Sequence, residues 1–454
     1  MIELAGRASE RWARRLYSVA LWLLQPLYVA RLCWRARREP LYRHRLAERF
    51  GWYDGPAPPP GAVWLHAVSL GETRAAAGLV KALRERCPQL RLLLTHATAT
   101  GRQAGQALLQ PGDRQVWLPF DTPGAVARFL AHHRPALGLL METEIWPNLQ
   151  HAAAVCGVPM VLVNARLSER SLRRGQRLGV LMRPAVRQLR WALAQTQADA
   201  QRLREAGVEH VEVCGNLKFD MTPQPELLAL GRGWRAAWEV AGPRPVVLAA
   251  STREGEEAAL LRAWQALPQP RPLLLLVPRH PQRFDEVAAL VQAAGLDLVR
   301  RSSWGAQRPE ASAGRADVCL GDSLGEMPAY YAAADVALLG GSFEPLGGQN
   351  LIEAAACGCP IVMGPHTFNF AEAAELAWQA GAACRVQTLS QGVQEAVALA
   401  VDSGRREDMA TRARRFAAAH RGAAQRMAER VLGLLLPTAD SARQQVVDRG
   451  QIVG

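Results

Sequence analysis

Short apolar runs alternate with longer amphipathic segments along this chain, and this alternation constrains its fold more than any other feature. The runs form two sets: 63–67, 90–95, 116–118, 137–140, 160–163 and 191–194, then 246–250, 273–277, 318–320, 336–339 and 361–363. Strands that alternate with helices indicate βαβ units and a parallel sheet covered by helices on both faces. The sequence therefore predicts an α/β fold with two doubly wound domains that face a central cleft.

The 454 residues are enough for two domains with separate cores. Residues 218–243 contain three prolines and no strand-like run, so they are expected to connect the domains. The predicted organisation is an N-terminal anchor with a basic flank at 1–50, a first domain at 51–217, this connection, a second domain at 244–405, and a C-terminal helix and tail at 406–454. The eight cysteines have no CxxC pair and no zinc-like spacing, which predicts reduced thiols, a cytosolic setting and no metal.

An apolar run near the N-terminus, Leu16–Ala30, is flanked by arginines on both sides. As a fifteen-residue helix it would reach only about 22 Å, short of the roughly 30 Å hydrocarbon core of a membrane, and Pro26 is expected to break it. No small-residue cleavage site follows, which argues against a removable signal peptide. The expectation is an uncleaved membrane anchor that dips into the cytoplasmic leaflet or barely spans the bilayer; a buried amphipathic helix is the alternative.

The net charge of +13 is concentrated in two windows. Residues 1–50 hold eleven Arg against four acidic residues, and residues 164–191 hold eight Arg against Glu169 alone. The second window predicts a basic amphipathic helix that binds an anionic membrane surface or a phosphorylated lipid, and a solvated basic helix is the alternative. The arginines assigned to this surface are Arg166, Arg170, Arg173, Arg174 and Arg177. No nucleic-acid-binding module is recognisable, so nucleic acid is not an expected partner.

Candidate chemistry in the first domain follows the ends of strands, where parallel α/β domains place it. Ser69 and Glu72 follow the first strand, and their spacing fits a helix-capping box as well as a carboxylate that faces the cleft. Glu142 and Glu144 follow a later strand, beside an apolar wall, 145–147, that would raise a carboxyl pKa. Glu72 and one of these two glutamates are expected to form a two-carboxylate site, and the choice between them is left open.

The most specific stretch of the second domain is Gly340–Pro360, where glycines follow a strand and precede a helix. Glycines allow close backbone approach to a ligand, and a helix that starts near Gly347–Asn350 would offer free amides to an anion. Glu353 in its first turn could accept a hydrogen bond from a ribose. Arg253 and Arg279 each follow a strand and could clamp a phosphate, with surface salt bridges as the alternative.

Two further features of the second domain have a structural and a functional interpretation. Ser323 and Glu326 repeat the Ser-Leu-Gly-Glu sequence of the first domain and again fit a capping box. His280, between Arg279 and a proline, is interpreted as a loop histidine rather than a catalytic one.

Several motifs occur together in a characteristic order: HAVSLGE, ETEIWPN, NARLSERS, GNLKFD, STREGEE, VPRHP, DSLGEM, GGSFEPLGGQN and GPHTFNF. In these motifs, up to about residue 430, the sequence resembles the 3-deoxy-D-manno-octulosonic acid (Kdo) transferases of lipopolysaccharide synthesis. The resemblance implies an inverting GT-B glycosyltransferase with two Rossmann-like domains, the donor in the C-terminal one, and neither metal nor cofactor. The implied donor is CMP-Kdo, and the implied acceptor is the tetraacyl disaccharide bisphosphate precursor of lipid A (lipid IVA), at the cytoplasmic face of the inner membrane.

Matched by position, Glu72 corresponds to the family's proposed general base and Glu142 to a second acidic residue that orients the sugar or stabilises positive charge at the reacting carbon. Many relatives are expected to have His at position 253, so the individual role of Arg253 is left open. The donor-binding residues that the resemblance implies are Lys218, Ser251, Arg253, Glu256, Arg279, His280, Ser323, Gly325, Glu326, Met327, Gly341, Ser342, Asn350 and Glu353.

Two other functions share parts of this pattern. Another GT-B lipid glycosyltransferase would use a UDP-sugar, and its donor preference would distinguish it. A non-catalytic sugar-nucleotide-binding membrane protein would bind CMP without turnover. The number of Kdo units added and the oligomeric state are not predicted.

Overall fold

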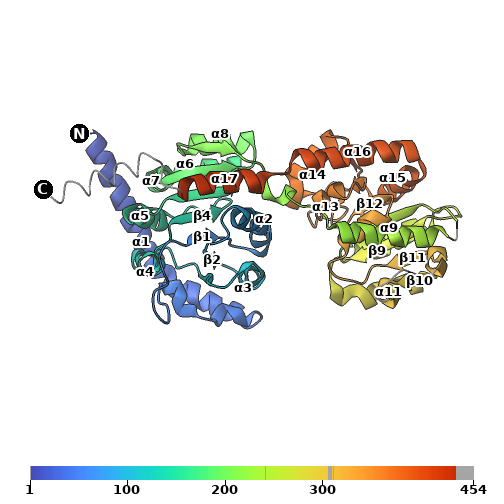
Figure 1. Cartoon of the computed structure of the whole chain (residues 1–454), viewed down its shortest axis with the longest axis horizontal. Helices are drawn as coiled ribbons and strands as arrows, with labels where there is room; N and C mark the ends of the chain where they lie inside the picture. The colour runs from blue at the N-terminus through green and yellow to red at the C-terminus, as the bar shows by residue number, and fades with distance from the viewer. Residues whose placement is uncertain (1, 241, 305–308, 310, 436–454) are drawn as a thin grey trace. The chain divides into compact units, whose positions relative to one another are not determined.

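The computed structural model describes residues 2–240, 242–304, 309 and 311–435, and the chain divides into two compact units (Figure 1). The first unit comprises the residues up to Asp220 together with those from Gly422 onward, and the second is Met221–Arg421. The first boundary falls three residues after the expected one at 217/218. The expected C-terminal segment 406–454 is shared between the two units.

The first unit is built on a seven-stranded sheet in which every neighbouring pair is parallel. Its order is β3-β2-β1-β4-β5-β6-β7. Val63 is in register with Leu92 on one side and Leu137 on the other. The strands are β1 (Val63–His66), β2 (Leu92–His96), β3 (Arg114–Trp117), β4 (Leu137–Met141), β5 (Met160–Ala165), β6 (Leu189–Ala194) and β7 (Val211–Val213).

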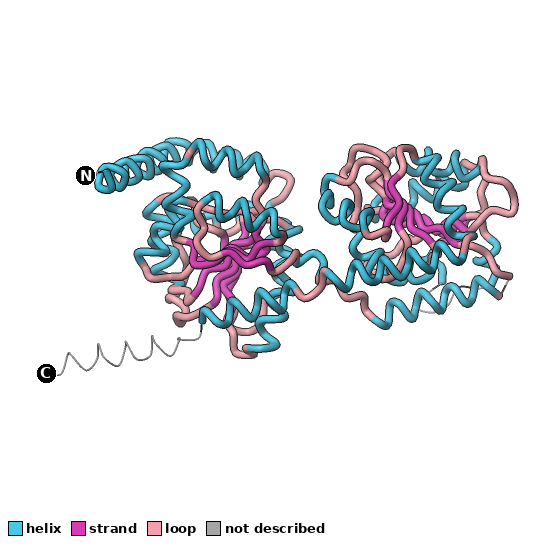
Figure 2. The backbone as a smooth tube through the Cα atoms, turned by 90° about the horizontal axis from the view of Figure 1, so that it is seen from above, coloured by secondary structure: helices cyan, strands magenta, loops and turns pink. Residues whose placement is uncertain are grey.

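Helices cover both faces of this sheet (Figure 2). Leu79 and Leu83 of α2 join the core on one face, and Phe129 of α4 and Leu149 of α5 join the core on the other. This arrangement explains why β1, β2, β4 and β5 are buried along their whole length. The helices are α1 (Ile2–Arg35), α2 (Leu70–Arg86), α3 (Ala99–Gly105), α4 (Pro123–His133), α5 (Pro147–Val155), α6 (Glu169–Arg177), α7 (Gly179–Arg187), α8 (Gln197–Ala206) and α17 (Ala423–Leu435), with 3-10 turns η1 (Pro40–Arg43), η2 (Leu46–Phe50), η3 (Gln106–Leu108) and η4 (Leu217–Phe219).

The last helix, α17, belongs to the first unit, as Figure 1 shows. Met427 and Val431 of α17 are fully buried in the core that also contains Leu79 of α2. The Asp220 carboxylate accepts hydrogen bonds from the amides of residues 422–424 at the start of α17. The chain therefore leaves and re-enters this unit at adjacent points.

The second unit has another seven-stranded parallel sheet, of order β10-β11-β9-β8-β12-β13-β14. Its strands are β8 (Val246–Thr252), β9 (Leu273–Pro278), β10 (Leu298–Arg300), β11 (Val318–Leu320), β12 (Val336–Leu339), β13 (Ile361–Met363) and β14 (Ala383–Arg385). Its helices are α9 (Pro225–Glu239), α10 (Glu256–Gln265), α11 (Phe284–Ala293), α12 (Met327–Ala333), α13 (Leu351–Ala356), α14 (Ala371–Gln379), α15 (Leu389–Val401) and α16 (Ser403–Ala419), with 3-10 turns η5 (Pro281–Arg283), η6 (Arg301–Trp304), η7 (Ala311–Arg315) and η8 (Phe368–Phe370).

Residues 218–243, expected to connect the domains, contain the helix α9 of the second unit. Trp234 and Trp238 of this helix are buried, and Trp234 packs against Tyr330 of α12 with ring centroids 5.3 Å apart. Pro225 occupies the first turn of α9, where its missing amide costs no hydrogen bond. The proline that suggested a connection therefore starts a packed helix.

Helix α1 contradicts the expected break at Pro26, because it continues through this residue to Arg35. Its 34 residues give a length of about 51 Å. Among the described residues, Ala8–Arg35 is the one helical stretch that could cross a membrane by its length and composition. Pro26 is on the solvent-exposed side, where the distortion caused by the ring meets no neighbour in this unit.

The single basic helix expected within 164–191 is also wrong, since the structure contains two short helices there. Ser168 caps α6 through its side chain, and the chain turns at Leu178 before α7 begins. Asn164 and Ala165 remain part of β5, and Leu189 starts β6. The backbone of Leu178 is not helical (φ −100°, ψ 27°), so the segment divides into two helices of nine residues each.

Candidate active site

In each unit, several of the candidate residues flank the point at which the strand order reverses. In the first unit this point lies between β1, which Glu72 follows, and β4, which Glu142 follows. In the second unit it lies between β8, which ends at Ser251 and Thr252, and β12, which Gly341 follows. Ligands of open α/β sheets bind at this position.

Non-glycine residues with positive φ occur at these strand ends. They are Glu142 (56°) after β4, Asn164 (52°) near the end of β5 and Ser251 (58°) near the end of β8. L side chains rarely adopt this conformation, and such residues cluster at functional sites. Backbone strain therefore occurs at candidate strand ends in both units, and Arg45 (48°) and Arg134 (43°) adopt positive φ elsewhere in the first unit.

Glu72 has a fixed orientation at the start of α2. Ser69 accepts a hydrogen bond from the Glu72 amide (3.4 Å) and donates its hydroxyl to one carboxylate oxygen (2.9 Å). The other carboxylate oxygen accepts from the amide of Val68 (2.9 Å). Burial raises the pKa of Glu72, and the Val68 and Ser69 hydrogen bonds oppose this rise. Glu72 therefore caps the helix and is also a half-buried carboxylate, so both interpretations of this residue hold together.

Three carboxylates, not two, gather at this site. Burial raises the pKa of Glu144 to about 7, and the charges of Glu72 and Glu142 contribute to the rise. Glu142 also raises the pKa of Glu72. The indole of Trp146 donates to Glu144 (2.9 Å) and opposes the rise. Mutual electrostatic effects of this kind require short separations, so we call Glu72, Glu142 and Glu144 the acidic cluster.

Lys218 lies in the first unit and acts on the acidic cluster, since its charge lowers the pKa of Glu72. It is in the turn η4, where the side chain of Asn216 accepts from the Lys218 amide (3.0 Å). The side chain of Asn164 accepts from the amide of Leu217 (2.9 Å), which ties this turn to the end of β5. Lys218 was expected as a donor contact, and the structure places it beside the predicted general base.

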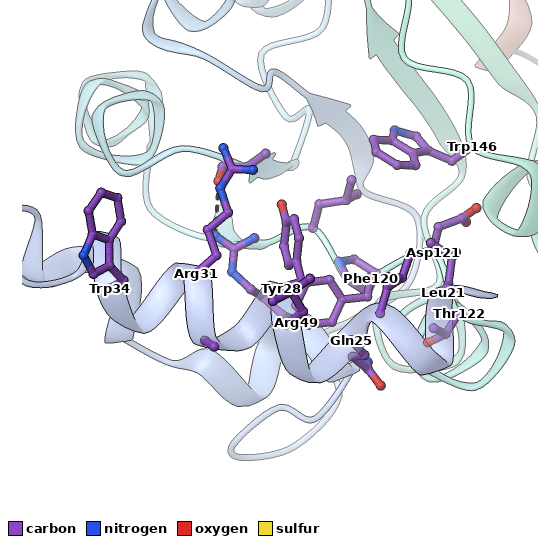
Figure 3. Close-up of a pocket in the computed structure, with 16 residues that line it drawn as sticks. Leu21, Gln25, Tyr28, Arg31, Trp34, Arg49, Phe120, Asp121, Thr122 and Trp146 are labelled. Atoms are coloured by element: carbon purple, nitrogen blue, oxygen red, sulfur yellow. Dashed lines mark hydrogen bonds between the residues drawn. The ribbon is translucent and has the colours of Figure 1, made fainter. Parts of the chain in front are cut away.

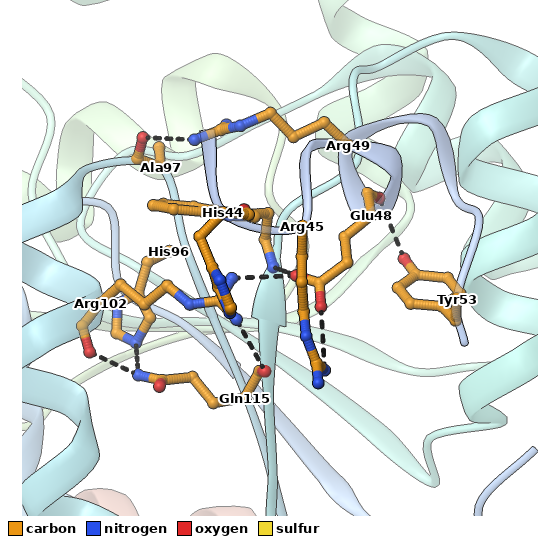
Figure 4. A network of polar contacts seen from close by, with 10 residues as sticks. His44, Arg45, Glu48, Arg49, Tyr53, His96, Ala97, Arg102 and Gln115 are labelled. Carbon is orange, nitrogen blue, oxygen red and sulfur yellow. Dashed lines mark hydrogen bonds and ion pairs between the residues drawn. The ribbon is translucent and has the colours of Figure 1, made fainter. Parts of the chain in front are cut away.

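Two buried histidines of the first unit are structural. His66 Nδ1 bonds the Thr95 hydroxyl (2.9 Å), and His96 Nδ1 bonds the Ala67 carbonyl (2.9 Å). Figure 4 shows the His96 ring against the side chain of Gln115. Burial lowers the pKa of His66 to about 3 and that of His96 to about 4. Both rings are neutral at physiological pH and stabilise the β1–β2 junction.

In the second unit, Glu256 binds backbone amides of the glycine loop. Its carboxylate accepts from the amide of Gly341 (2.8 Å to each oxygen) and from the amide of Arg253 (2.9 Å). Burial raises the pKa of Glu256, and these hydrogen bonds oppose the rise. Glu256 therefore positions the segments after β8 and β12 through their main chains.

Charged groups from three segments of the second unit interact at the strand ends. The positive charges of Arg253 and Arg279 lower the pKa of His280, adding to the larger effect of burial. Burial raises the pKa of Glu353, and Arg279 opposes that rise. Nε of Arg253 is buried and has no hydrogen-bond partner among the described residues. Nε of Arg253 is thus a free donor within the described part of the chain, and the lowered pKa of His280 favours its neutral form, while its role stays a prediction.

The capping role expected for Ser323 and Glu326 is wrong. Helix α12 begins at Met327, one residue after Glu326, and has no side-chain cap. Glu326 forms a two-point ion pair with Arg301 (2.8 and 3.1 Å), and Ser323 bonds Glu326 and the hydroxyl of Tyr330. The two Ser-Leu-Gly-Glu sequences thus adopt different structures because Arg301 binds the second glutamate.

The remaining donor candidates lie in the same strand-end loops. Gly325 and Gly341 have positive φ (81° and 68°), and the hydroxyl of Ser251 contacts the sulfur of Met327 (3.9 Å). Ser342 is buried and accepts from the amide of Gly364 (2.9 Å), which joins the glycine loop to β13.

The helix expected to start near Gly347–Asn350 begins at Leu351. Its cap is Asn350, whose side-chain oxygen accepts from the Ile352 amide (3.1 Å) and whose nitrogen contacts the sulfur of Met221. Glu353 is in the first turn of this helix, as expected. The Asn350 side chain thus occupies one of the amides that was expected to be available to an anion.

The five candidate membrane arginines are all exposed on or next to α6. One of them, Arg173, is paired with Glu169. Leu178 and Val180, at the junction of α6 and α7, have 53% and 52% of their surface exposed. This surface is therefore both basic and apolar.

Among the described residues, no group of three or more His, Cys, Asp or Glu side chains is arranged to hold a metal ion.

Comparison with known proteins identifies relatives of this chain. The sequence model of a family described as "3-Deoxy-D-manno-octulosonic-acid transferase (kdotransferase)" matches residues 44–221. A 3-deoxy-D-manno-octulosonic acid transferase of Bordetella pertussis is 51% identical, over 91% of this chain and 97% of the relative. One from Haemophilus influenzae is 35% identical, over 93% of this chain and 98% of the relative.

Among solved structures, HepE of Anabaena in complex with UDP is similar with a TM-score of 0.52. It is 16% identical, and the match covers 82% of this chain and 99% of that chain. UDP-GlcNAc 2-epimerase from Neisseria meningitidis has a TM-score of 0.51 at 15% identity, over 83% and 100% of the two chains. These likenesses concern the fold alone, and they confirm the predicted GT-B class with two Rossmann-like domains.

Proposed function

Since this chain belongs to the 3-deoxy-D-manno-octulosonic acid transferase family and is a glycosyltransferase, we propose that its donor is CMP-Kdo and its acceptor the tetraacyl disaccharide bisphosphate precursor of lipid A. The transfer inverts the configuration of the anomeric carbon. The observation that best supports this proposal is the acidic cluster, which lies beside the point where the strand order reverses between β1 and β4. An acceptor hydroxyl needs a nearby base when its oxygen attacks the anomeric carbon.

In this mechanism Glu72 is the general base. A hydroxyl oxygen of the acceptor forms the new bond to the anomeric carbon while the bond from that carbon to the phosphate of CMP breaks. CMP leaves with the electron pair, and the hydroxyl proton moves to Glu72. Burial makes Glu72 a stronger base than an exposed glutamate, and each of its bonded oxygens keeps a second lone pair for the proton. Glu142 stabilises positive charge at the reacting carbon.

The second unit binds the donor. Arg253 and Arg279 neutralise the phosphate of CMP as it leaves, which is the task of a metal in other transferases. Glu256 and Ser342 act indirectly by positioning the loops after β8 and β12. Glu353 accepts from a ribose hydroxyl. Activity unaffected by a chelator such as EDTA would support a reaction without a metal, and loss of activity that Mg²⁺ restores would contradict it.

Helix α1 and the basic surface of α6 hold the enzyme at the cytoplasmic face of the inner membrane. Arginines beside exposed Leu178 and Val180 match an interface that is anionic at its surface and apolar below. α1 also packs on α7, so the apolar helix and the basic surface belong to one region of the first unit.

The test is transfer by the purified full-length protein in detergent micelles. Labelled donors, CMP-Kdo and UDP-glucose, are offered with the acylated acceptor. Product with CMP-Kdo only is expected, and mass spectrometry of that product counts the Kdo units. The anomeric configuration, determined by NMR, should be opposite to that of the donor. Transfer from the UDP-sugar instead would contradict the proposed donor.

A further inference from the structure

A groove of about 670 Å³ lies between α1 and the strand-end loops of the first unit (Figure 3). Leu21, Gln25 and Tyr28 of α1 form one wall, and Leu118, Phe120 and Trp146 contribute to the other. The walls are predominantly apolar, and the volume lies within the ~300–1,000 Å³ that is usual for ligand pockets.

The groove is a built feature because α1 is fixed near its middle and near its C-terminal end. On one side, the hydroxyl of Tyr17 donates to Asp121 (3.0 Å) and Ser18 bonds Asn148 (3.2 Å). On the other side, Tyr28 packs edge-on against Phe120, with ring centroids 5.1 Å apart. Leu32 is buried in a small core that also contains Ala99 of α3.

The outer surface of the same helix is apolar and exposed. Leu23 has 77% of its surface exposed and Leu27 has 69%, and Leu27 also lines the groove. Because α1 is the helix that the membrane would take up, the groove opens toward lipid. An apolar chain can therefore enter it without crossing water.

One wall carries a buried cation. Arg49 is only 2% exposed, its guanidinium stacks on Trp117 (4.1 Å from the ring centroid), and it donates to the Ala97 carbonyl (3.2 Å). The neighbouring Glu48 carboxylate is bound instead by Arg102 (2.9 Å) and by the amide of Trp117 (Figure 4).

Because the Glu48 carboxylate binds these other groups, it does not pair with Arg49. Nε of Arg49 has no hydrogen-bond partner among the described residues. A buried donor calls for an acceptor oxygen. The occupant that fits is an amphiphile with an apolar chain and a carbonyl or phosphate group. A purely apolar protein segment would leave this donor unpaired.

The groove also touches the acidic cluster. Trp146 lines the groove and donates its indole hydrogen to Glu144. A ligand whose chain fills the groove thus has its polar end beside the carboxylates. On the basis of the proposed function, we infer that this groove binds an acyl chain of the acceptor lipid and so positions the acceptor sugar at the acidic cluster.

The kinetic test compares the acylated acceptor with the same disaccharide bisphosphate after complete deacylation. Leu21→Gln makes the groove polar, Gln25→Trp fills it, and Leu23→Gln is the matched control outside it. Each methylene moved into an apolar site favours binding about fourfold, so both groove variants should raise KM for the acylated acceptor tenfold or more. They should leave kcat/KM for the deacylated acceptor unchanged, and Leu23→Gln should keep the wild-type ratio between the two acceptors. An unchanged KM in both groove variants would overturn the inference.

A second measurement needs no turnover. An acceptor with a photoreactive acyl chain is cross-linked to the wild-type protein, and the labelled peptides are identified by mass spectrometry. Label in residues 118–122, lost in Gln25→Trp, would support the groove even if no Kdo were transferred, in which case the proposed function alone would fail. Transfer with label only outside the groove would overturn the groove and leave the proposed function standing.

Discussion

The three carboxylates of the acidic cluster cannot titrate independently. Glu72 and Glu142 both raise the pKa of Glu144, and interactions between like charges are reciprocal. Because Glu144 ionises only near pH 7, it is still neutral when Glu72 loses its proton, and Glu142 is the carboxylate that makes Glu72 hold its proton more strongly. The base strength of Glu72 depends on neighbours that the reaction does not consume.

Replacing Glu142 with Gln should shift the acidic limb of the pH profile of kcat/KM to lower pH. The raised pKa of Glu72 falls when a nearby negative charge is removed, so the base becomes ionised at lower pH. Measuring kcat/KM from pH 5 to pH 9 tests this expectation. Glu85→Gln, an exposed substitution on α2, is the control, and an acidic limb that stays in place or moves to higher pH in Glu142→Gln would contradict the coupling.

The sequence identified Glu72, Glu142 and Glu144 as candidate carboxylates of the first unit. It did not predict the contacts of the corresponding glutamates in the second unit. Glu256 binds the amide of Gly341, and Glu326 binds Arg301. The first contact joins residues 85 positions apart and the second joins residues 25 positions apart. Neither follows from a local motif, which is why Glu326 was expected to cap a helix.

Among the secondary-structure elements, α17 is the helix whose position in the fold could not be predicted from its sequence pattern. It is amphipathic like α16 before it, yet only α17 packs in the first unit. Its buried residues Met427 and Val431 contact the core around Cys214, while Cys319 is buried in β11 of the second unit. The two cysteines therefore report separately on the two units.

Met427→Ala should lower the free energy of unfolding of the first unit by about 2–4 kcal/mol, because it leaves a cavity in a fully buried site. Thiol labelling followed by mass spectrometry against urea should expose Cys214 at lower urea, with no change for Cys319. Glu429→Ala, on the exposed side of α17, should change neither transition. Earlier exposure of Cys319 together with Cys214 would show that α17 does not stabilise the first unit alone.

Central strands were predictable, whereas three of the four edge strands were not. The expected runs 63–67 and 137–140 correspond to β1 and β4, which are buried on both faces and so are continuously apolar. β7, β10 and β14 were missed. Each has three residues that are mostly half-buried at or near a sheet edge, and no apolar run marks them.

At the scale of the whole molecule, basic charge and exposed apolar surface are distributed unequally between the two units. The basic surface of α6 and the exposed face of α1 belong to the first unit, whereas the donor candidates other than Lys218 belong to the second. This division agrees with the proposal that the first unit meets the lipid acceptor and the second meets the soluble donor.

Replacing Arg166, Arg170, Arg174 and Arg177 with Gln should weaken binding to vesicles that contain anionic lipid. Each arginine near an anionic surface contributes about fivefold in affinity at low salt, so a decrease of tenfold or more is expected even with partial engagement. Co-sedimentation at low and high salt measures it, with neutral vesicles as the control. The same decrease for neutral vesicles would contradict an electrostatic role for α6.

The central claim, that Glu72 is the base of Kdo transfer, is tested most directly by single-turnover transfer from labelled CMP-Kdo in Glu72→Gln. The account predicts a loss of roughly 10²-fold or more in rate, with CMP binding and the thermal unfolding midpoint close to those of the wild type. Glu85→Gln should transfer at the wild-type rate. Wild-type transfer by Glu72→Gln would contradict the account, limit Glu72 to capping α2, and assign the base to Glu142 or Glu144.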